Sequence, residues 1–156
     1  MDHSVLVKLF RDQGFITIRE GNGKSITLIK PEDWKQDQGN EWIYLLFDLF
    51  QIRTISEQFS EVSLDIVEFA SKPTIYSSPA NNRVPADLKN DGLIRFSLIR
   101  DPDWNKFLFQ LSQPVLAKLD SSNIPDVEIK NYFPLYGPNV KEIYLGAEGD
   151  VKIIKG

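Results

Sequence analysis

Apolar residues recur with helical spacing at the start of the segment formed by residues 62–119, and strand-like runs follow. A helix is predicted over residues 62–70, since its apolar positions fall at i, i+4, i+7 and i+8. These positions are Val62, Ile66, Phe69 and Ala70. The β-branched and aromatic run at 74–76 predicts a strand, as do the apolar runs at 93–99 and 114–117. With the second helix predicted between residues 99 and 114, helices alternate with strands in this segment, which is the pattern of an α/β fold.

Asp101-Pro102 predicts the start of a second helix in this segment. Aspartate is a favoured N-cap residue, and proline fits the first helical position. The apolar residues that follow are spaced i, i+3, i+4 and i+7 and are expected to face the core: Trp104, Phe107, Leu108 and Leu111. Asp101 and Asp103 could also form a metal-binding pair. Capping and the helix dipole already favour acidic residues at this place, so capping is the preferred interpretation.

The chain before this segment predicts a helix over residues 2–13, with Gly14 ending it as a C′ glycine. The expected buried stripe of this helix is Val5, Leu6, Leu9 and Phe10. Strands are expected at 15–20 and 25–29, joined by a two-residue turn in which Asn22 and Gly23 both take positive φ. Gly23-Lys24-Ser25 also matches the end of a phosphate-loop motif. That motif needs a helix next, whereas a strand is predicted here, so a hairpin is favoured.

The remaining elements follow from similar patterns. Residues 42–47 form an apolar run that predicts a central strand buried on both faces. A helix is expected next, with four apolar residues on it: Phe50, Ile52, Ile55 and Phe59. Residues 127–133 are compatible with a strand or a short helix, and no structure is predicted with precision for 124–141. Residues 142–147 and 151–155 predict a terminal hairpin.

Composition narrows the class of protein. The 156 residues are enough for one domain with a core, which we expect to span residues 1–156. The absence of cysteine excludes disulfides and thiol chemistry and fits a cytoplasmic location. The net charge of −4 argues against a broad basic surface for nucleic acid but is compatible with a local basic patch. No apolar run reaches the ~18 residues of a membrane span, so no membrane partner is expected.

Few residues suggest chemistry on their own. His3 is the only histidine and lies in the first turn of a terminal helix, so no catalytic triad is assigned around it. Five large aromatic residues could suggest a base-stacking surface, but their spacing favours core packing. They are Trp34, Trp42, Trp104, Tyr44 and Tyr76.

Three stretches of the sequence resemble the YrdC-like family, the threonylcarbamoyl-AMP synthases of tRNA modification. They are residues 64–76, 91–94 and 113–116. The resemblance implies a single α/β domain with a twisted mixed sheet and packed helices. It covers about sixty residues well and the remainder loosely, and it lies mainly in fold-type positions.

The family motifs that would bind substrate are altered. The threonine-rich loop of the family is replaced by Arg19-Glu20-Gly21-Asn22. In the family's lysine-x-arginine pair, Lys35 occupies the lysine position and Asp37 the arginine position. The family's strand-end arginine aligns with Ser97. The sequence Ser121-Ser122-Asn123 approximates the family's serine-asparagine loop, although turns favour these residue types without a ligand.

The candidate nucleotide-binding residues are therefore Lys35, Arg95, Arg100, Ser121 and Asn123. No catalytic residue and no metal ligand is assigned. The favoured hypothesis is a degenerate, non-catalytic YrdC-like domain that binds a nucleotide, RNA or a protein of the tRNA-modification pathway. The alternative is an active synthase that joins threonine, bicarbonate and ATP with magnesium.

Overall fold

The computed structural model describes residues 1–39, 41–57 and 59–156. The described residues form a single α/β domain around one mixed sheet of nine strands, in the order β7-β1-β2-β6-β3-β5-β4-β8-β9. The α-helices are α1 (His3–Gln13), α2 (Glu61–Phe69) and α3 (Pro102–Leu111). The strands are β1 (Phe15–Arg19), β2 (Ser25–Ile29), β3 (Ile43–Leu46), β4 (Thr74–Pro79), β5 (Leu93–Leu98), β6 (Val115–Lys118), β7 (Val127–Glu128), β8 (Lys141–Leu145) and β9 (Val151–Lys155). Short 3₁₀ helices occur at η1 (Pro31–Asp33), η2 (Gln36–Gln38), η3 (Leu49–Thr54), η4 (Ala86–Leu88) and η5 (Pro134–Tyr136).

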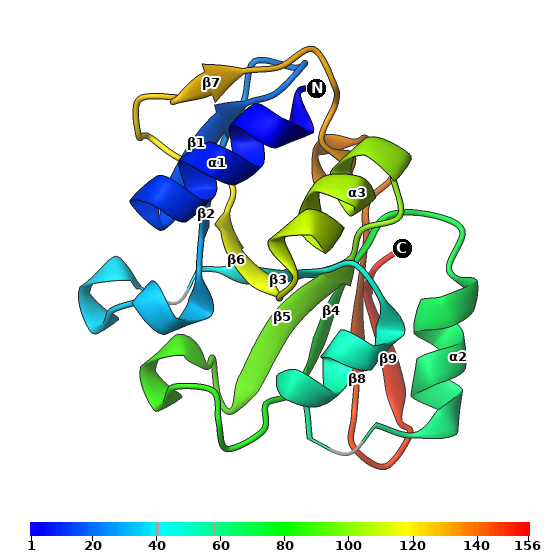
Figure 1. Cartoon of the computed structure of the whole chain (residues 1–156). Helices are drawn as coiled ribbons and strands as arrows, with labels where there is room; N and C mark the ends of the chain where they lie inside the picture. Colours follow the sequence, from blue (N-terminus) through cyan, green and yellow to red (C-terminus); the bar gives the residue numbers. More distant parts are fainter. Residues whose placement is uncertain (40, 58) are drawn as a thin grey trace.

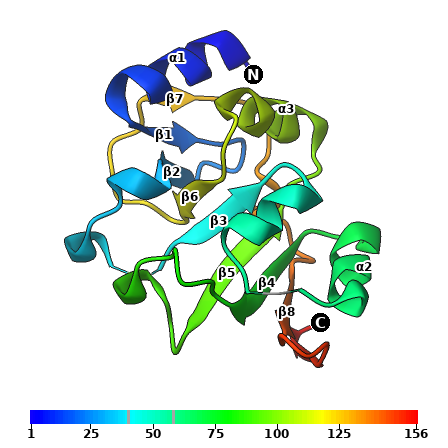
Figure 2. The same ribbon diagram turned by 60° about the horizontal axis from the view of Figure 1, so that its bottom comes forward.

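The sheet has a hydrophobic core on each face. Helices α1 and α3 cover one face and lie against each other, whereas α2 and η3 pack on the other (Figure 1). Alternate residues of β3 enter the two cores, because successive side chains of a strand point to opposite faces: Ile43 and Leu45 into the first, Tyr44 and Leu46 into the second. The predicted central strand is confirmed. Figure 2 shows α2 well apart from the pair formed by α1 and α3.

The start and the buried face of α3 are as predicted. The Asp101 side chain accepts hydrogen bonds from the backbone N–H groups of Asp103 and Trp104, both at 3.1 Å. All four apolar residues predicted to face the core are buried: Trp104, Phe107, Leu108 and Leu111. Gly14 likewise ends α1 in the left-handed conformation, with φ of 79°.

The predicted faces of two helices are wrong in part. In α2 the residues predicted to be buried include Val62 and Phe69, which are 57% and 76% exposed. The buried face instead carries Ser63 and Val67. Ser63 can be buried because its hydroxyl accepts a hydrogen bond from the hydroxyl of Ser60, so it acts as a small, satisfied residue. In α1, a smaller shift of the same kind exposes Val5 and buries Val7.

The β1–β2 hairpin forms where predicted, but its turn is longer. Only Gly23 has positive φ in this turn, at 82°. The Glu20 N–H donates to the carbonyl of Lys24 at 2.9 Å, and the Gly23 N–H donates to the carbonyl of Glu20 at 2.8 Å. These bonds define a three-residue loop, a type I turn followed by a left-handed glycine, in place of the two-residue turn. A strand follows the turn, so the phosphate-loop motif lacks its helix.

The other predictions have mixed outcomes. The terminal hairpin β8–β9 is confirmed. The helix expected around Phe50 is the short 3₁₀ helix η3, in which Phe50 is 73% exposed and Ile52 is buried. In the stretch 127–133, β7 is a two-residue strand parallel to β1. None of the helices in the described part of the chain has the length and apolar character needed to cross a membrane.

Candidate functional site

Three of the five candidate nucleotide-binding residues line one pocket. This loop pocket, of about 640 Å³, lies against β2, η2 and the loop that follows β6. Lys35, Ser121 and Asn123 line it. Ser121 and Asn123 lie close to β2 because β6 pairs antiparallel with β2, which places the loop after β6 beside the start of β2.

The hydroxyl and amide groups of the loop pocket are bonded to one another. The Thr27 hydroxyl lies 2.7 Å from that of Ser121 and 2.8 Å from that of Thr17. The side-chain amide of Asn123 donates to the same Thr27 hydroxyl at 3.2 Å. A ligand would therefore have to compete with existing hydrogen bonds to reach Ser121 or Asn123. Sequence analysis missed Thr27, although its place opposite Thr17 in the hairpin could have indicated a buried polar pair.

Charge in the loop pocket is balanced. Lys35 and Lys118 line it together with Asp33 and Asp37. Asp37, which occupies the position of the family arginine, thus faces the same space as Lys35. Two carboxylates near two ammonium groups leave little net attraction for a triphosphate.

A second pocket gathers cationic and aromatic side chains. This basic cavity, of about 690 Å³, is bounded by the α2–β4 connection, the end of β5 and residues 132–138. Its lining includes three cations, Lys24, Lys72 and Arg100, and one carboxylate, that of Asp101. Asp101 caps α3, so its charge is already directed at backbone N–H groups. Within a chain of net charge −4, the cavity is a local concentration of positive charge.

The cations of the basic cavity come from separate elements. Lys24 leads into β2, and its Nζ lies 4.9 Å from the centre of the Tyr136 ring, a cation–π contact. Arg100 follows β5, and its Nη2 donates to the carbonyls of Val67 and Glu68 at the end of α2. Neither ion pair in the described part of the chain includes Lys24, Lys72 or Arg100. Their charges are therefore not neutralised by a close carboxylate.

Tyrosines supply the polar edge of the basic cavity. Burial raises the pKa of Tyr136 to about 12, so its hydroxyl is neutral at physiological pH. This hydroxyl donates to the carbonyl of Ser25 at 3.1 Å and accepts from the N–H of Asp120 at 2.7 Å. Burial also raises the pKa of Tyr76, although a hydrogen bond from Thr74 and the charge of Arg100 oppose the effect. The tyrosines are hydrogen-bonding groups with aromatic faces and carry no charge.

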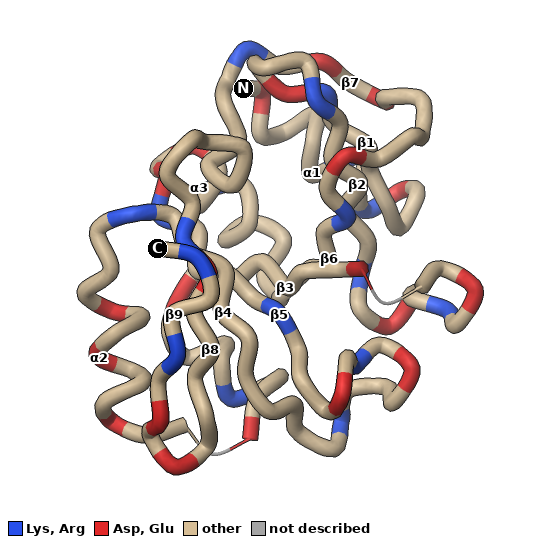
Figure 3. Tube along the Cα trace, turned by 180° about the vertical axis from the view of Figure 1, so that it is seen from behind, with Lys and Arg blue, Asp and Glu red and all other residues tan. Residues whose placement is uncertain are grey.

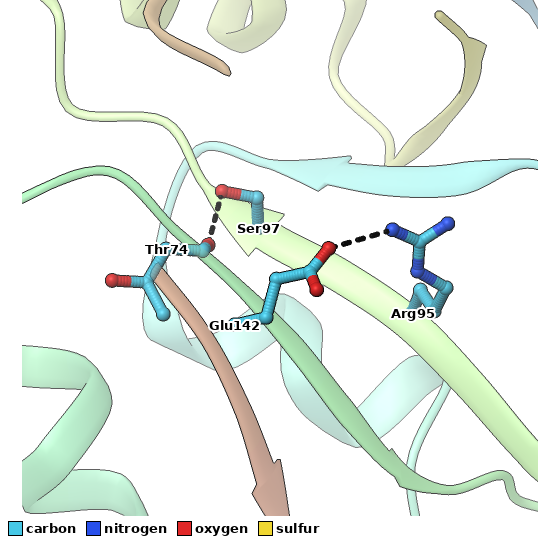
Figure 4. A network of polar contacts seen from close by, with 4 residues as sticks. All are labelled: Thr74, Arg95, Ser97 and Glu142. Atoms are coloured by element: carbon cyan, nitrogen blue, oxygen red, sulfur yellow. Dashed lines mark hydrogen bonds and ion pairs between the residues drawn. The ribbon is translucent and has the colours of Figure 1, made fainter. Parts of the chain in front are cut away.

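Arg95 lies outside both pockets. Its guanidinium forms an ion pair with Glu142 of β8 at 3.4 Å (Figure 4). In the same view, the Ser97 hydroxyl donates to the carbonyl of Thr74 at 2.7 Å. Ser97 therefore joins β5 to β4 at the position where the family has an arginine. Arg100 is the candidate that lines the basic cavity. From the sequence, Lys24 was considered only in the phosphate-loop motif, which was set aside, and Lys72 was not considered as a binding residue.

Residues considered for metal binding or general-base chemistry are used structurally. Asp103 accepts a hydrogen bond from the Asn131 side chain at 2.8 Å, and Asp101 caps α3. The His3 Nε2 donates to the carbonyl of Asp103 at 2.8 Å, which ties α1 to α3. No group of three histidine, aspartate or glutamate side chains suited to a metal ion occurs among the described residues.

The architecture is that of a single α/β domain around one mixed sheet. No protein-family model matches the sequence, and a search of curated proteins finds no significant match. Solved structures do match. Escherichia coli YciO superposes with a TM-score of 0.71 at 15% identity, covering 98% of this chain and 87% of that one. A variant of Pyrococcus abyssi Sua5 gives 0.71 at 10% identity, covering 92% and 50%, and full-length HypF gives 0.70 at 12% identity, covering 98% and 28%.

The expected YrdC-like fold is therefore confirmed. The chain spans half of the length of Sua5 and about a quarter of that of HypF, so it corresponds to one part of those longer proteins. One of these structures is HypF in a phosphate- and nucleotide-bound form, and another is Sua5 in complex with L-threonine.

Proposed function

We propose that this chain is a non-catalytic YrdC-like domain that binds a nucleoside monophosphate in the basic cavity. The main support for this proposal is that Lys24, Lys72 and Arg100 line one cavity. None of the three has a close ion-pair partner among the described residues. A volume of about 690 Å³ falls in the usual range for small-molecule sites. The nucleotide-bound form of HypF, which shares the fold, supports the ligand class.

The cavity offers separate partners for the parts of a nucleotide. Arg100 uses only Nη2 in the described hydrogen bonds, so other guanidinium N–H groups are available for a phosphate. Lys72 adds a flexible point charge. Tyr132 and Tyr136 present aromatic faces of the kind on which bases stack. Three cations line the cavity, and one of them, Arg100, also donates hydrogen bonds to the end of α2. This number of cations is enough to balance the charge of a single phosphate group.

The loop pocket supports loss of the synthase reaction. In the family, a lysine and an arginine help to hold the triphosphate, and here Lys35 is accompanied by Asp37 in the same pocket. Arginine grips phosphate oxygens in pairs, whereas a carboxylate repels them. Ser121 and Asn123 are bonded to Thr27, and the threonine-rich loop is replaced by the β1–β2 turn. Positioning of both substrates is therefore weakened.

Calorimetry with AMP, ATP, L-threonine and a short single-stranded RNA tests the binding proposal. AMP is expected to bind, and Lys72→Ala should weaken it at least about tenfold through loss of one phosphate contact. Lys106→Ala is the matched control, because Lys106 is exposed on α3 outside the cavity. At a concentration of about a hundred times Kd, AMP should add about 2.7 kcal/mol to stability. An equal loss of AMP affinity in Lys72→Ala and Lys106→Ala, or no AMP binding at all, would contradict a nucleotide site in the basic cavity.

Pyrophosphate release in the presence of ATP, threonine, bicarbonate and magnesium tests the catalytic part. We expect none above background. Turnover close to that of an active family member, lost in Lys35→Ala, would establish the alternative of an active synthase. Tight RNA binding without AMP binding would instead support the RNA-binding hypothesis and overturn the nucleotide proposal.

A further inference from the structure

An open groove runs between η3 and α2 on the face of the sheet away from α1 and α3. It is the largest of the described pockets, at about 910 Å³. Its apolar lining includes the buried Ile52 and the partly buried Phe59 and Leu64. Phe50 also lines the groove and is 73% exposed. A large aromatic side chain in that position leaves an apolar surface open to solvent beside a concave apolar floor.

The walls of the groove are acidic. Four carboxylates line it, those of Glu57, Glu61, Asp65 and Glu68. Among the described residues of the lining, Arg53 is the only cation, and its guanidinium lies 5.7 Å from the centre of the Phe50 ring. Neither ion pair in the described chain includes any of these carboxylates. Figure 3 shows acidic positions along α2 with no basic position among them.

Two of the three carboxylates on α2 are at unfavourable places for the helix. The dipole favours Glu61 in the first turn, but Asp65 follows it at i+4, where like charges destabilise a helix. Glu68 lies in the last turn, close to the negative end of the helix dipole. Arg100 offsets part of that cost by donating to the carbonyls of Val67 and Glu68. Asp65 and Glu68 thus contribute little to the stability of α2, and the alignment of carboxylates along one edge of an apolar groove needs another explanation.

We propose that this groove docks a basic amphipathic helix of a partner protein. Its apolar face would cover Phe50 and the groove floor, and lysines or arginines would face the three carboxylates of α2. Glu61, Asp65 and Glu68 are spaced i, i+4 and i+7, so a helix lying along α2 can present cations with the same repeat. Nucleic acid does not fit, because its phosphates would meet the carboxylates. This surface lies on residues different from those of the basic cavity, so the inference stands apart from the nucleotide proposal.

The probe is a synthetic amphipathic helical peptide with leucines on one face and lysines on the other, labelled for fluorescence anisotropy. A second peptide has glutamate in place of every lysine. The full chain is expected to bind the lysine peptide at one site, and the glutamate peptide at least about tenfold more weakly. Binding of the lysine peptide should weaken as salt rises, since the carboxylates are near the surface.

Two groove variants and two matched controls locate the site. Phe50→Ala and the double variant Glu61→Gln/Asp65→Asn should each weaken binding of the lysine peptide about tenfold or more. The first removes an apolar contact, and the second removes two carboxylates that pair with lysines. Phe69→Ala removes an equally exposed phenylalanine that does not line the groove. Asp87→Asn/Glu148→Gln removes the same number of charges from exposed positions outside it. Both controls should stay within about twofold of the unsubstituted chain.

Three results would overturn the proposal. They are the absence of saturable binding by the lysine peptide, unchanged binding in Phe50→Ala, and an equal loss in the groove and control charge variants. Circular dichroism of every variant checks that the fold is retained. All substituted side chains in these variants are exposed, so the fold should tolerate the changes.

Discussion

Replacement of Glu20 by glutamine should destabilise the domain more than any surface charge substitution. Glu20 is only 2% exposed and accepts hydrogen bonds through both carboxylate oxygens. One oxygen accepts from the N–H of Asn22 at 2.7 Å, and the other accepts from the N–H of Phe133 at 2.8 Å. The side chain therefore joins the β1–β2 turn to the segment that precedes β8.

The magnitude follows from these two bonds. Hydrogen bonds to a charged acceptor contribute about 1.5–3 kcal/mol each, and a buried N–H left without a partner costs about 1–3 kcal/mol. Glutamine keeps one acceptor oxygen and places an NH₂ group where the other was. Asn22 is exposed, so its N–H can hydrogen-bond to water, whereas the N–H of Phe133 is buried. We expect a loss of about 2–4 kcal/mol, or about 4–16 °C in Tm for a domain of this size.

Urea denaturation followed by circular dichroism measures the loss directly. Glu142→Gln is the control, since it removes a half-exposed carboxylate that pairs with Arg95 at 3.4 Å and should cost less than about 1 kcal/mol. Tyr132 and Phe133 line the basic cavity, so Glu20→Gln should also weaken AMP binding. A loss for Glu20→Gln no greater than that for Glu142→Gln would refute the idea that this buried carboxylate holds the two segments together.

Three further predictions concern packing, backbone space and pH. Phe107→Ala should cost about 3–5 kcal/mol in urea denaturation because Phe107 is fully buried, and a loss below about 1 kcal/mol would contradict its place in the core. Gly21→Ala should destabilise the domain by about 1–3 kcal/mol, since its Cβ would lie 2.5 Å from the Lys130 carbonyl oxygen and 2.6 Å from the Tyr132 ring; thermal unfolding indistinguishable from the parent would show that this contact is loose. Burial raises the pKa of Tyr44 to about 12, so the folded state holds its proton more tightly than the unfolded state and stability should fall as pH rises from about 10 to about 12. Between about pH 10 and about pH 12, Tyr44→Phe should lose less stability than the unsubstituted chain in denaturation experiments, and an identical loss would assign the effect to other groups.

Local signals in the sequence determined most of the secondary structure. The N-cap and core face of α3, the C′ glycine of α1 and the position of the β1–β2 hairpin all depend on residues within one or two turns of each other. The continuous apolar run at β3 identified the centre of the sheet, because only a strand covered on both faces can bury every side chain. The family resemblance predicted the topology that the comparisons with solved structures confirm.

The spacing of apolar residues predicted the wrong buried face where a polar residue is buried or an apolar residue is exposed. Ser63 counts as polar in the pattern of α2, but its hydrogen bond with Ser60 allows it to face the sheet, which turns Val62 and Phe69 outward. The two-residue strand β7 has no signal of its own, because only its pairing with β1 defines it.

The sequence and its family resemblance identified five candidates, Lys35, Arg95, Arg100, Ser121 and Asn123, and placed Asp37 at the arginine position. Only the tertiary structure decided that Thr27 bonds the last two of these candidates and that the loop pocket is balanced in charge. It also decided that Lys24, Lys72 and Arg100 line a single cavity. The reason is physical: hydrogen bonds and electrostatic attraction depend on distances in space, and the pairing of strands far apart in the sequence sets those distances.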